Sequence, residues 1–517
     1  MTARIRKGTA FLSGALGVAL VGATSVRADV TIQLDAGGGL SVRDSTGAIE
    51  RLRVDEATGS ISRNGTLFIH TTGALSTFVG SDAGSTASAG IDNSGFGVEA
   101  LRGNTSGNYN SALGFRALRF TSTGNANSGF GAQVLIANTT GSANSAFGRS
   151  ALSSNVSGSS NSAFGSYALG LNTASYNSAF GHRALGANTS GGSNAALGAH
   201  ALRSNTTGSY NTAVGYSALR ANTTGRTNTA VGDRALLSNT TGSYNSAVGQ
   251  GALFSNTTGR YNAAFGRAAL HANGTGFFNT AHGHYALYSN SSGGFNTAVG
   301  QKALFFNTTG SHNTAVGQGS LFYNTSGDSN IALGKYAGIS QTNGSNNIYL
   351  QNGGVAGESG QIKIGTVGTH TRAWIAGIHG IAIPSGSQVF VNPNGLLGTS
   401  SISSARFKRD VRDLGKASDV LMRLRPVSFR YREEAVGEPA DADETQYGLI
   451  AEEVAEVAPE LVTPDSEGRP YSVKYHELPT LLLNEVQEQR RTIERLEARI
   501  AELEGKPLDT ERRAVAR

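Results

Sequence analysis

The sequence predicts a mainly β protein: a repetitive parallel β-roll or solenoid rod, a β-rich neck, and a small α+β C-terminal domain that ends in a coiled-coil helix. Three observations lead to this prediction. Of 517 residues, 70 are Gly and only 9 are Pro, a five-residue pattern recurs every 17 residues, and charge is concentrated near the C-terminus. The chain contains no Cys, which excludes disulfides, thiolate metal sites and a Cys nucleophile.

Charge divides the chain into two regions. From Asn93 to Leu350 there are 13 Lys and Arg against 3 Asp and Glu in 258 residues, whereas from Ser404 to Arg517 there are 19 against 24 in 114 residues. We therefore expect a domain boundary near residue 403. The net charge of +6 is modest for this length and does not indicate nucleic-acid binding. Solvated arginines on an exposed face explain the basic middle region, with binding to anionic glycans or lipids as the alternative.

Residues 1–28 have the pattern of a signal peptide. Basic residues at Arg4, Arg6 and Lys7 precede an apolar stretch, and small residues allow cleavage after Ala28. No later segment approaches 18 apolar residues, so we expect no membrane span in the mature chain. The pattern predicts export, to the medium or the cell surface, with an uncleaved anchor as the alternative. Residues 29–92 are expected to form an N-terminal β cap region.

A 17-residue repeat fills residues 93–350. Its marker is Asn, Ser or Thr, Ala, an apolar residue and Gly. The spacing is 17 throughout except for one step of 16, between Asn161 and Asn177, and weaker copies begin at Asn93 and Asn347. The first-place residues of the clear copies are Asn110, Asn127, Asn144, Asn161, Asn177, Asn194, Asn211, Asn228, Asn245, Asn262, Asn279, Asn296, Asn313 and Asn330.

Each place of the repeat has a physical explanation. Small and apolar residues at places three, four, eight and nine are expected to stack as a core, in coils with two brief strands each. Gly at place five suits a bend or a close backbone approach, and Gly at place fifteen suits a turn with positive φ. Asn at place twelve is expected to stack as a hydrogen-bonded ladder. The 16-residue copy lacks a residue in the turn at 172–176, where a solenoid tolerates deletions.

The core places hold small residues and one Leu per coil, which is thin for a lone chain, so we expect three chains to share a core as a homotrimer. The pentad resembles the head repeats of trimeric autotransporter adhesins, which form trimeric parallel β-rolls. This resemblance implies adhesion, with a surface glycan or protein as the ligand. Histidines of the middle region fall at variable places without metal-ligand spacing, so we predict neither a metal site nor a cofactor.

Residues 351–402 are expected to form the neck. Short strands are predicted at 361–365, 373–376 and 388–392, and the last of these is followed by a turn at 393–395 and a further strand at Leu396 and Leu397. Packing is the role expected for Trp374, the single Trp of the chain.

The C-terminal region carries five motifs in a fixed order. They are Ser403-Ser-Ala-Arg-Phe-Lys408, Arg425-Pro-Val-Ser-Phe-Arg-Tyr431, Tyr447-Gly-Leu-Ile-Ala-Glu-Glu-Val454, Pro459-Glu-Leu-Val462 and Val473-Lys-Tyr475. In order and spacing they resemble the intramolecular chaperone auto-processing domain of phage tailspikes and endosialidases, a self-cleaving serine–lysine peptidase. The resemblance implies that Ser403 is the nucleophile, that Lys408 is the general base, and that the bond between Ile402 and Ser403 is cut.

A lysine acts as a base only when burial or nearby cations lower its pKa, and Arg406 and Arg409 are the cations near Lys408. The sequence has Ser404 where that family commonly has Asp. The neighbouring hydroxyls of Ser400, Ser401 and Ser404 leave open which one acts.

The end of the chain is predicted to be a coiled-coil helix. Apolar residues alternate in steps of four and three, at Leu482, Val486, Gln489, Ile493, Leu496, Ile500 and Leu503. The boundaries expected are 403–480 for the self-cleaving chaperone domain, 481–505 for the helix and 506–517 for a disordered tail.

The function predicted is an exported, adhesin-like trimeric fibre whose C-terminal chaperone drives trimerisation and then cleaves itself off. At most, the enzymatic activity is that of a serine endopeptidase acting on its own chain. One alternative is the same fibre with a trimerisation domain that never cuts. The other is a glycan-degrading enzyme, which the repeats disfavour because their only acids are Glu99, Asp233 and Asp328.

Overall fold

The computed structural model describes residues 3–4, 31–34, 40–43, 50–55, 57, 59–72, 75–86, 88–373, 375, 389–392, 394–398, 403–432, 445–465 and 467–505. The chain divides into two compact units, residues 1–380 and 381–517. Of the predicted signal peptide only Ala3–Arg4 are described, as strand β1. The predicted tail at 506–517, Trp374 and Ala376 lie outside the described residues.

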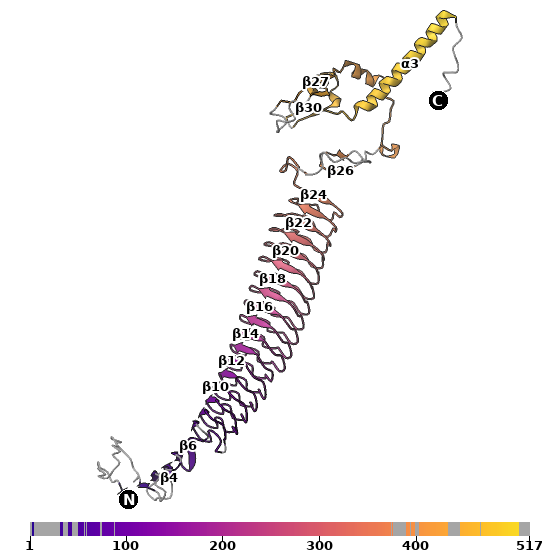
Figure 1. The fold of residues 1–517 in the computed structure, drawn as a ribbon. Helices are drawn as coiled ribbons and strands as arrows, with labels where there is room; N and C mark the ends of the chain where they lie inside the picture. Colours follow the sequence, from indigo (N-terminus) through magenta and orange to yellow (C-terminus); the bar gives the residue numbers. More distant parts are fainter. Residues whose placement is uncertain are drawn as a thin grey trace. The chain divides into compact units, whose positions relative to one another are not determined.

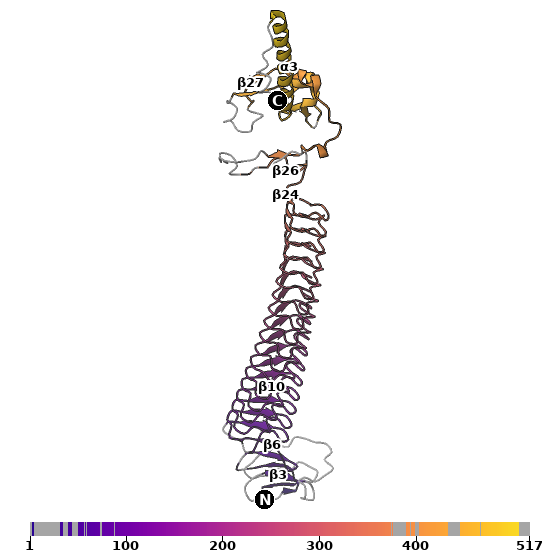
Figure 2. The same ribbon diagram turned by 90° about the vertical axis from the view of Figure 1, so that its right-hand side faces the viewer.

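The first unit is a β-solenoid in which short parallel strands stack coil upon coil (Figures 1 and 2). An antiparallel run of strands β1 to β7 leads into it, and β7 to β24 pair in parallel, each with the next. The antiparallel strands are β2 (Thr31–Leu34), β3 (Leu40–Arg43), β4 (Glu50–Val54), β5 (Ile61–Arg63) and β6 (Thr66–His70). The parallel strands are β7 (Thr77–Val79), β8 (Ser94–Phe96), β9 (Ser111–Leu113), β10 (Ser128–Phe130), β11 (Ser145–Phe147), β12 (Ser162–Phe164), β13 (Ser178–Phe180), β14 (Ala195–Leu197), β15 (Thr212–Val214), β16 (Thr229–Val231), β17 (Ser246–Val248), β18 (Ala263–Phe265), β19 (Thr280–His282), β20 (Thr297–Val299), β21 (Thr314–Val316), β22 (Ile331–Leu333), β23 (Ile348–Leu350) and β24 (Ile362–Ile364).

The predicted solenoid is confirmed, with one strand per coil instead of two. Each strand holds places two to four of the repeat, and the remaining places form turns whose backbones also bond from coil to coil, as where the Leu219 N–H donates to the Ala235 carbonyl over 2.9 Å. A second strand is absent from the described repeats because Leu at place nine adopts a left-handed conformation, with φ of 52° at Leu219. A left-handed residue curves the chain too tightly for an extended strand.

The core of the solenoid is closed within one chain. Ala213 at place three, Ala218 at place eight and Leu219 at place nine are each 0% exposed, and the same places are buried throughout the stack. The expectation that three chains share this core is therefore wrong, because the turns wrap each coil around its own apolar residues. Contacts between chains must use the outer surface of the coils.

Two ladders of buried Asn run along this core. At place twelve, Asn222 Nδ2 donates to Asn205 Oδ1 over 2.7 Å and to the Gly225 carbonyl, which confirms the predicted ladder. Place one forms a second ladder that was not predicted, as where Asn228 Nδ2 donates to Asn211 Oδ1 over 3.1 Å. The deletion in the 16-residue coil falls in the turn as predicted, and the Ala174 carbonyl there accepts the bond that a Gly carbonyl accepts elsewhere.

An Asn222→Leu substitution is expected to destabilise the stack by about 3 kcal/mol, because it removes the bonds of Asn222 to Asn205, Gly225 and Asn239 and leaves the buried Asn205 Oδ1 without a donor. The exposed Thr224→Ala is the control, with a change below about 0.5 kcal/mol. Hydrogen exchange across residues 205–245 measures both effects. Equal protection in the two variants would show that the ladder contributes nothing.

Gly occurs at places five and fifteen for different reasons. Gly215 at place five has φ of 129°, and a Cβ there would lie 2.5 Å from the Gly232 carbonyl oxygen, so both predicted reasons hold. Gly225 at place fifteen does not have positive φ, so that prediction is wrong. A Cβ at Gly225 would lie 2.3 Å from the Gly242 carbonyl oxygen and 2.4 Å from Asn222 Oδ1. This Gly is required by lack of space beside the Asn ladder.

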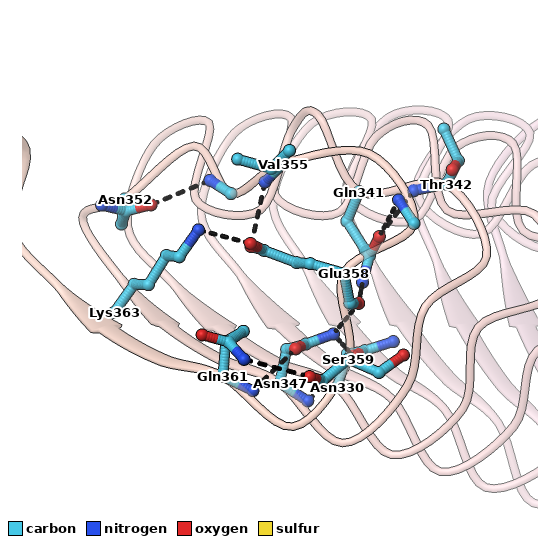
Figure 3. Close-up of polar contacts among 12 residues, drawn as sticks. Asn330, Gln341, Thr342, Asn347, Asn352, Val355, Glu358, Ser359, Gln361 and Lys363 are labelled. Atoms are coloured by element: carbon cyan, nitrogen blue, oxygen red, sulfur yellow. Dashed lines mark hydrogen bonds and ion pairs between the residues drawn. The ribbon is translucent and has the colours of Figure 1, made fainter. Parts of the chain in front are cut away.

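Other polar groups stand beside the Asn residues at the two ends of the ladders. At the start of the stack, Ser76 Oγ accepts from the Asn93 backbone N–H and Ser88 Oγ accepts from Asn104 Nδ2. At the end, the Glu358 carbonyl accepts from Asn347 Nδ2 over 2.8 Å and from Gln341 Nε2 over 2.7 Å (Figure 3). The Glu358 carbonyl thus accepts from the last residue at each place, whereas Oδ1 of Asn324, the last Asn at place twelve, is buried without a hydrogen-bond partner among the described residues.

The Glu358 side chain holds the closing loop in place. Its carboxylate accepts from the Val355 backbone N–H over 2.9 Å and pairs with Lys363 (Figure 3). Burial opposes the charge of this carboxylate, but the hydrogen bond from Lys363 and that from the Val355 N–H lower the pKa of Glu358 below its ordinary value.

Acid is expected to loosen the last coil. Because the pKa of Glu358 is lowered by folding, its carboxylate contributes stability that is complete above the unfolded pKa of about 4.3 and is lost as pH falls through the folded pKa. Protection factors of residues 347–364 should therefore fall between about pH 5 and pH 3 in the unaltered chain. A Glu358→Gln variant should lack this pH dependence, and a fall of the same size in the variant would refute the assignment.

The first described strands of the second unit are β25 (Phe390–Val391) and β26 (Leu397–Gly398), whose antiparallel pairing agrees with the predicted order of strand, turn and strand. The elements that follow are η1 (Ala405–Phe407), η2 (Gly415–Arg423), β27 (Val427–Phe429), β28 (Gln446–Gly448), α2 (Ala451–Val457), η4 (Pro459–Leu461), β29 (Val462–Pro464), β30 (Pro470–Val473) and α3 (Leu478–Glu504). β27 pairs with β28 and β29 with β30, both antiparallel. The small core consists of Val454, Ala458, Leu461, Val462 and Val473.

Candidate functional site

The structure brings the two predicted site residues together. Lys408 Nζ donates to Ser403 Oγ over 3.3 Å. The short helix η1 lies between them, and the Lys408 backbone N–H closes its turn on the Ala405 carbonyl over 3.0 Å. This turn reverses the chain so that a side chain five residues on reaches back to Ser403. Both side chains are exposed in the single chain.

The bond predicted to be cut lies at the edge of the described chain. Ile402, Ser400 and Ser401 lie outside the described residues, so the structure does not describe the carbonyl that Ser403 would attack. Ser404 precedes η1 in an extended conformation, and its carbonyl accepts from the Phe407 N–H over 3.1 Å. Among the described serines, Ser403 is the one placed at hydrogen-bond distance from Lys408 Nζ.

The two arginines near the lysine differ in their surroundings. The guanidinium of Arg406 lies over the ring of Phe407, 4.7 Å from its centroid, while Arg409 is exposed. The predicted electrostatic role of these two cations on Lys408 stays a prediction.

The remaining motifs hold the domain together by contacts that the sequence did not predict. Arg425 Nε donates to Glu453 Oε2 over 3.0 Å, and this hydrogen bond lowers the pKa of Glu453. The Leu449 backbone N–H donates to the Tyr475 hydroxyl over 2.8 Å. Gly448 leaves room for that hydroxyl, since a Cβ there would lie 2.6 Å from it. These residues fix the strands and α2, and none of the contacts involves Ser403 or Lys408.

Helix α3 is anchored at its start, and beyond this anchor its apolar residues have no covering partner among the described residues. Asn484 Nδ2 donates to the buried Ser418 Oγ over 2.7 Å and to the Gly415 carbonyl, which attaches α3 to η2. The predicted helix is confirmed over Leu478–Glu504. Its heptad residues are exposed by 53–73% in one chain, and we call this set the heptad stripe: Leu482, Val486, Ile493, Leu496, Ile500 and Leu503.

An apolar groove of about 770 Å³ lies beside the start of α3. Its lining includes Leu424, Val427, Tyr447 and Leu478, together with Leu482 of the heptad stripe. Within the described residues, none of the helices has the length and apolar character needed to cross a bilayer.

Comparison with known proteins identifies one part of the chain. Residues 403–463 match the family model described as chaperone of endosialidase, and the match begins at Ser403. No curated protein matches the chain. A chaperone domain after a β-solenoid rod fits a tail-fibre-like trimeric protein. Residues 403–463 are therefore a C-terminal domain of the chaperone of endosialidase family.

Proposed function

We propose that this chain is an exported, homotrimeric, adhesin-like surface fibre whose C-terminal domain assembles three chains and then cleaves itself off between Ile402 and Ser403. The observation that carries the proposal is the family match, which starts at the proposed nucleophile. The 3.3 Å contact between Lys408 Nζ and Ser403 Oγ supports the serine–lysine chemistry.

In the proposed reaction, neutral Lys408 takes the proton of the Ser403 hydroxyl as Oγ attacks the Ile402 carbonyl carbon. The carbon–nitrogen bond breaks, and the amine of Ser403 takes a proton as it leaves. The resulting ester between Ile402 and Ser403 Oγ is then hydrolysed by water. The products are a rod with a new carboxylate and a C-terminal fragment with a new amine.

Assembly by the C-terminal domain explains why a slow-folding rod carries it. Parallel pairing between coils is nonlocal and slow to start, and packing of whole chains adds to that cost. A stripe of exposed apolar residues on α3 offers a fast first contact between chains. The β-branched residues Val486, Ile493 and Ile500 favour two-stranded coiled coils when such a helix is isolated. The proposal that three chains assemble therefore depends on the family match and not on the helix.

A substitution in the heptad stripe tests the assembly role. Leu496→Glu is expected to abolish trimers and to lower the yield of refolded rod at least tenfold, because three carboxylates would meet in the seam. Ala498→Glu adds the same charge two residues away, outside the heptad stripe, and should leave the trimer and the yield of refolded rod unchanged. Mass by light scattering and circular dichroism after refolding measure the two results. Trimers of Leu496→Glu in full yield would contradict the role.

A domain that trimerises without cutting is the second candidate. Ser404 in place of the usual Asp favours it, as does the exposure of Ser403 and Lys408, which none of the described residues shields from water. The N-terminal sequence of any C-terminal fragment decides between the two.

A glycan-degrading rod has little support. Glu99 is held by Arg116 at 2.6 Å and by Arg102 at 2.8 Å, so it serves as a structural anion. Asp233 and Asp328 belong to coils five steps apart, which at about 4.8 Å per step is roughly 24 Å. Carboxyl pairs of glycosidases are at most about 9.5 Å apart.

A further inference from the structure

We propose that the outward strand face of the solenoid is the surface along which copies of this chain pack, parallel and in register. The inference rests on the proposed homotrimer and assigns the part of the rod that makes it. We call this surface the strand face and define it as places two and four of each coil, in strands β8 to β23.

The strand face has one continuous apolar column. In each three-residue strand the middle residue is buried and its two neighbours point outward, as in β17, where Ala247 is buried between Ser246 and Val248. The residues at place four are apolar in every coil but one, where His282 stands. Ten of the fifteen apolar side chains are 36–53% exposed, and the other five are half-buried. The residues at place four are Phe96, Leu113, Phe130, Phe147, Phe164, Phe180, Leu197, Val214, Val231, Val248, Phe265, His282, Val299, Val316, Leu333 and Leu350.

Strand pairing aligns this column along the whole stack. Parallel register places Phe130, Phe147 and Phe164 opposite one another, with ring centroids 4.6 Å apart at each step. Place two beside it holds Ser, Thr or Ala in all but the last two coils, where Ile stands. Small neighbours let a second flat surface approach the apolar column closely.

Charge is excluded from the strand face. All 16 charged residues between Asn93 and Leu350 fall at places six, seven, ten or sixteen, and none falls at place two or four. Soluble monomers rarely expose a contiguous apolar patch above a few hundred Å². A column that runs through sixteen coils without a single charge is therefore an interface, and the basic residues mark the surfaces that stay in water.

The partner that fits this column is another copy of the chain. Apolar residues recur every 17 residues at strand spacing, and only a rod with the same repeat matches them over the full length. Parallel in-register packing sets the Phe-rich coils from Phe130 to Phe180 against each other and the Val-rich coils from Val214 to Val248 against each other. The heptad stripe of α3 is an independent apolar surface along which parallel copies of the chain can also pack.

A single Cys introduced into the Cys-free chain tests the inference. Val248→Cys on the strand face is compared with Arg260→Cys at place sixteen, which is also exposed. A disulfide requires Cβ atoms about 3.5–4.5 Å apart, so only residues near the axis between copies will join. We expect oxidation of full-length Val248→Cys to give covalent dimers that contain up to two thirds of the chains. Arg260→Cys should stay uncrosslinked.

The mass of the reduced variants shows whether the chain is a trimer, and the crosslinks show whether the strand face is its interface. Trimers that crosslink through Val248→Cys and not through Arg260→Cys support the strand face. Trimers that do not crosslink at Val248→Cys, or crosslink equally at Arg260→Cys, overturn the inference and leave the proposed trimer standing. Single chains without crosslinks overturn both.

Discussion

A Ser403→Ala variant is expected to remain one full-length polypeptide, whereas the unaltered chain yields a rod ending at Ile402 and a fragment beginning at Ser403. The hydroxyl is the only group at this position that can attack the preceding carbonyl, so its removal should abolish cleavage. Intact mass and N-terminal sequencing of the purified protein measure the result. Lys408→Met keeps the length of the side chain without its amine and is expected to slow cleavage by about 10²–10⁴.

Ser404→Ala is the matched control. It removes the neighbouring hydroxyl, leaves the 3.3 Å contact between Lys408 and Ser403 in place, and should cut at the same bond. A fragment that begins at position 403 in the Ser403→Ala protein as well, or one that disappears only in Ser404→Ala, would assign the chemistry to another group. A full-length band from every variant and from the unaltered chain would favour the domain that never cuts.

A Gly232→Ala substitution is expected to cost about 3–5 kcal/mol and to break the stack locally. Gly232 has φ of 134°, and a Cβ there would lie 2.7 Å from both the carbonyl carbon and the oxygen of Gly249. Neither backbone can move without disturbing the parallel strands on both sides. Thermal melting by circular dichroism, with hydrogen exchange in residues 211–261, measures the loss.

Gly274→Thr is the control for that change. Gly274 has no positive φ, and its nearest atom to an added Cβ is the Ser291 carbonyl oxygen at 3.5 Å. Other coils carry Thr at this place, as where Thr257 Oγ1 donates to the Gly274 carbonyl over 3.0 Å. The substitution is therefore expected to raise stability by about 0.5–1 kcal/mol. Equal losses at Gly232 and Gly274 would mean that position in the coil does not matter.

The stacking of the rod could be predicted because the sequence repeats, but the backbone conformation within each coil could not. Ala213, Leu219 and Asn222 were correctly expected to stack, because a residue type that recurs at one place contacts the equivalent residue of the next coil. The left-handed Leu219 was not expected, since non-Gly residues seldom adopt that conformation. Only the wrapped coil shows that Leu reaches the core this way and that one chain suffices to bury it.

The candidate site was predictable for a different reason. Ser403 and Lys408 were found because they belong to a local motif six residues long, whose turn brings them together. Arg425 and Glu453 are 28 residues apart, and Tyr475 and Leu449 are 26 apart, so nothing local in the sequence pairs them. Such contacts depend on how strands and α2 pack, which no single segment specifies.

The mass of the purified full-length chain under native conditions tests the central claim most directly. The account predicts three chains, held by the heptad stripe of α3 and by the strand face of the rod. Native mass spectrometry before and after cleavage should give three chains in both cases, because the packed rods keep the assembly once the C-terminal domain has left. A stable single chain or a pair of chains, with the solenoid folded, would contradict the account.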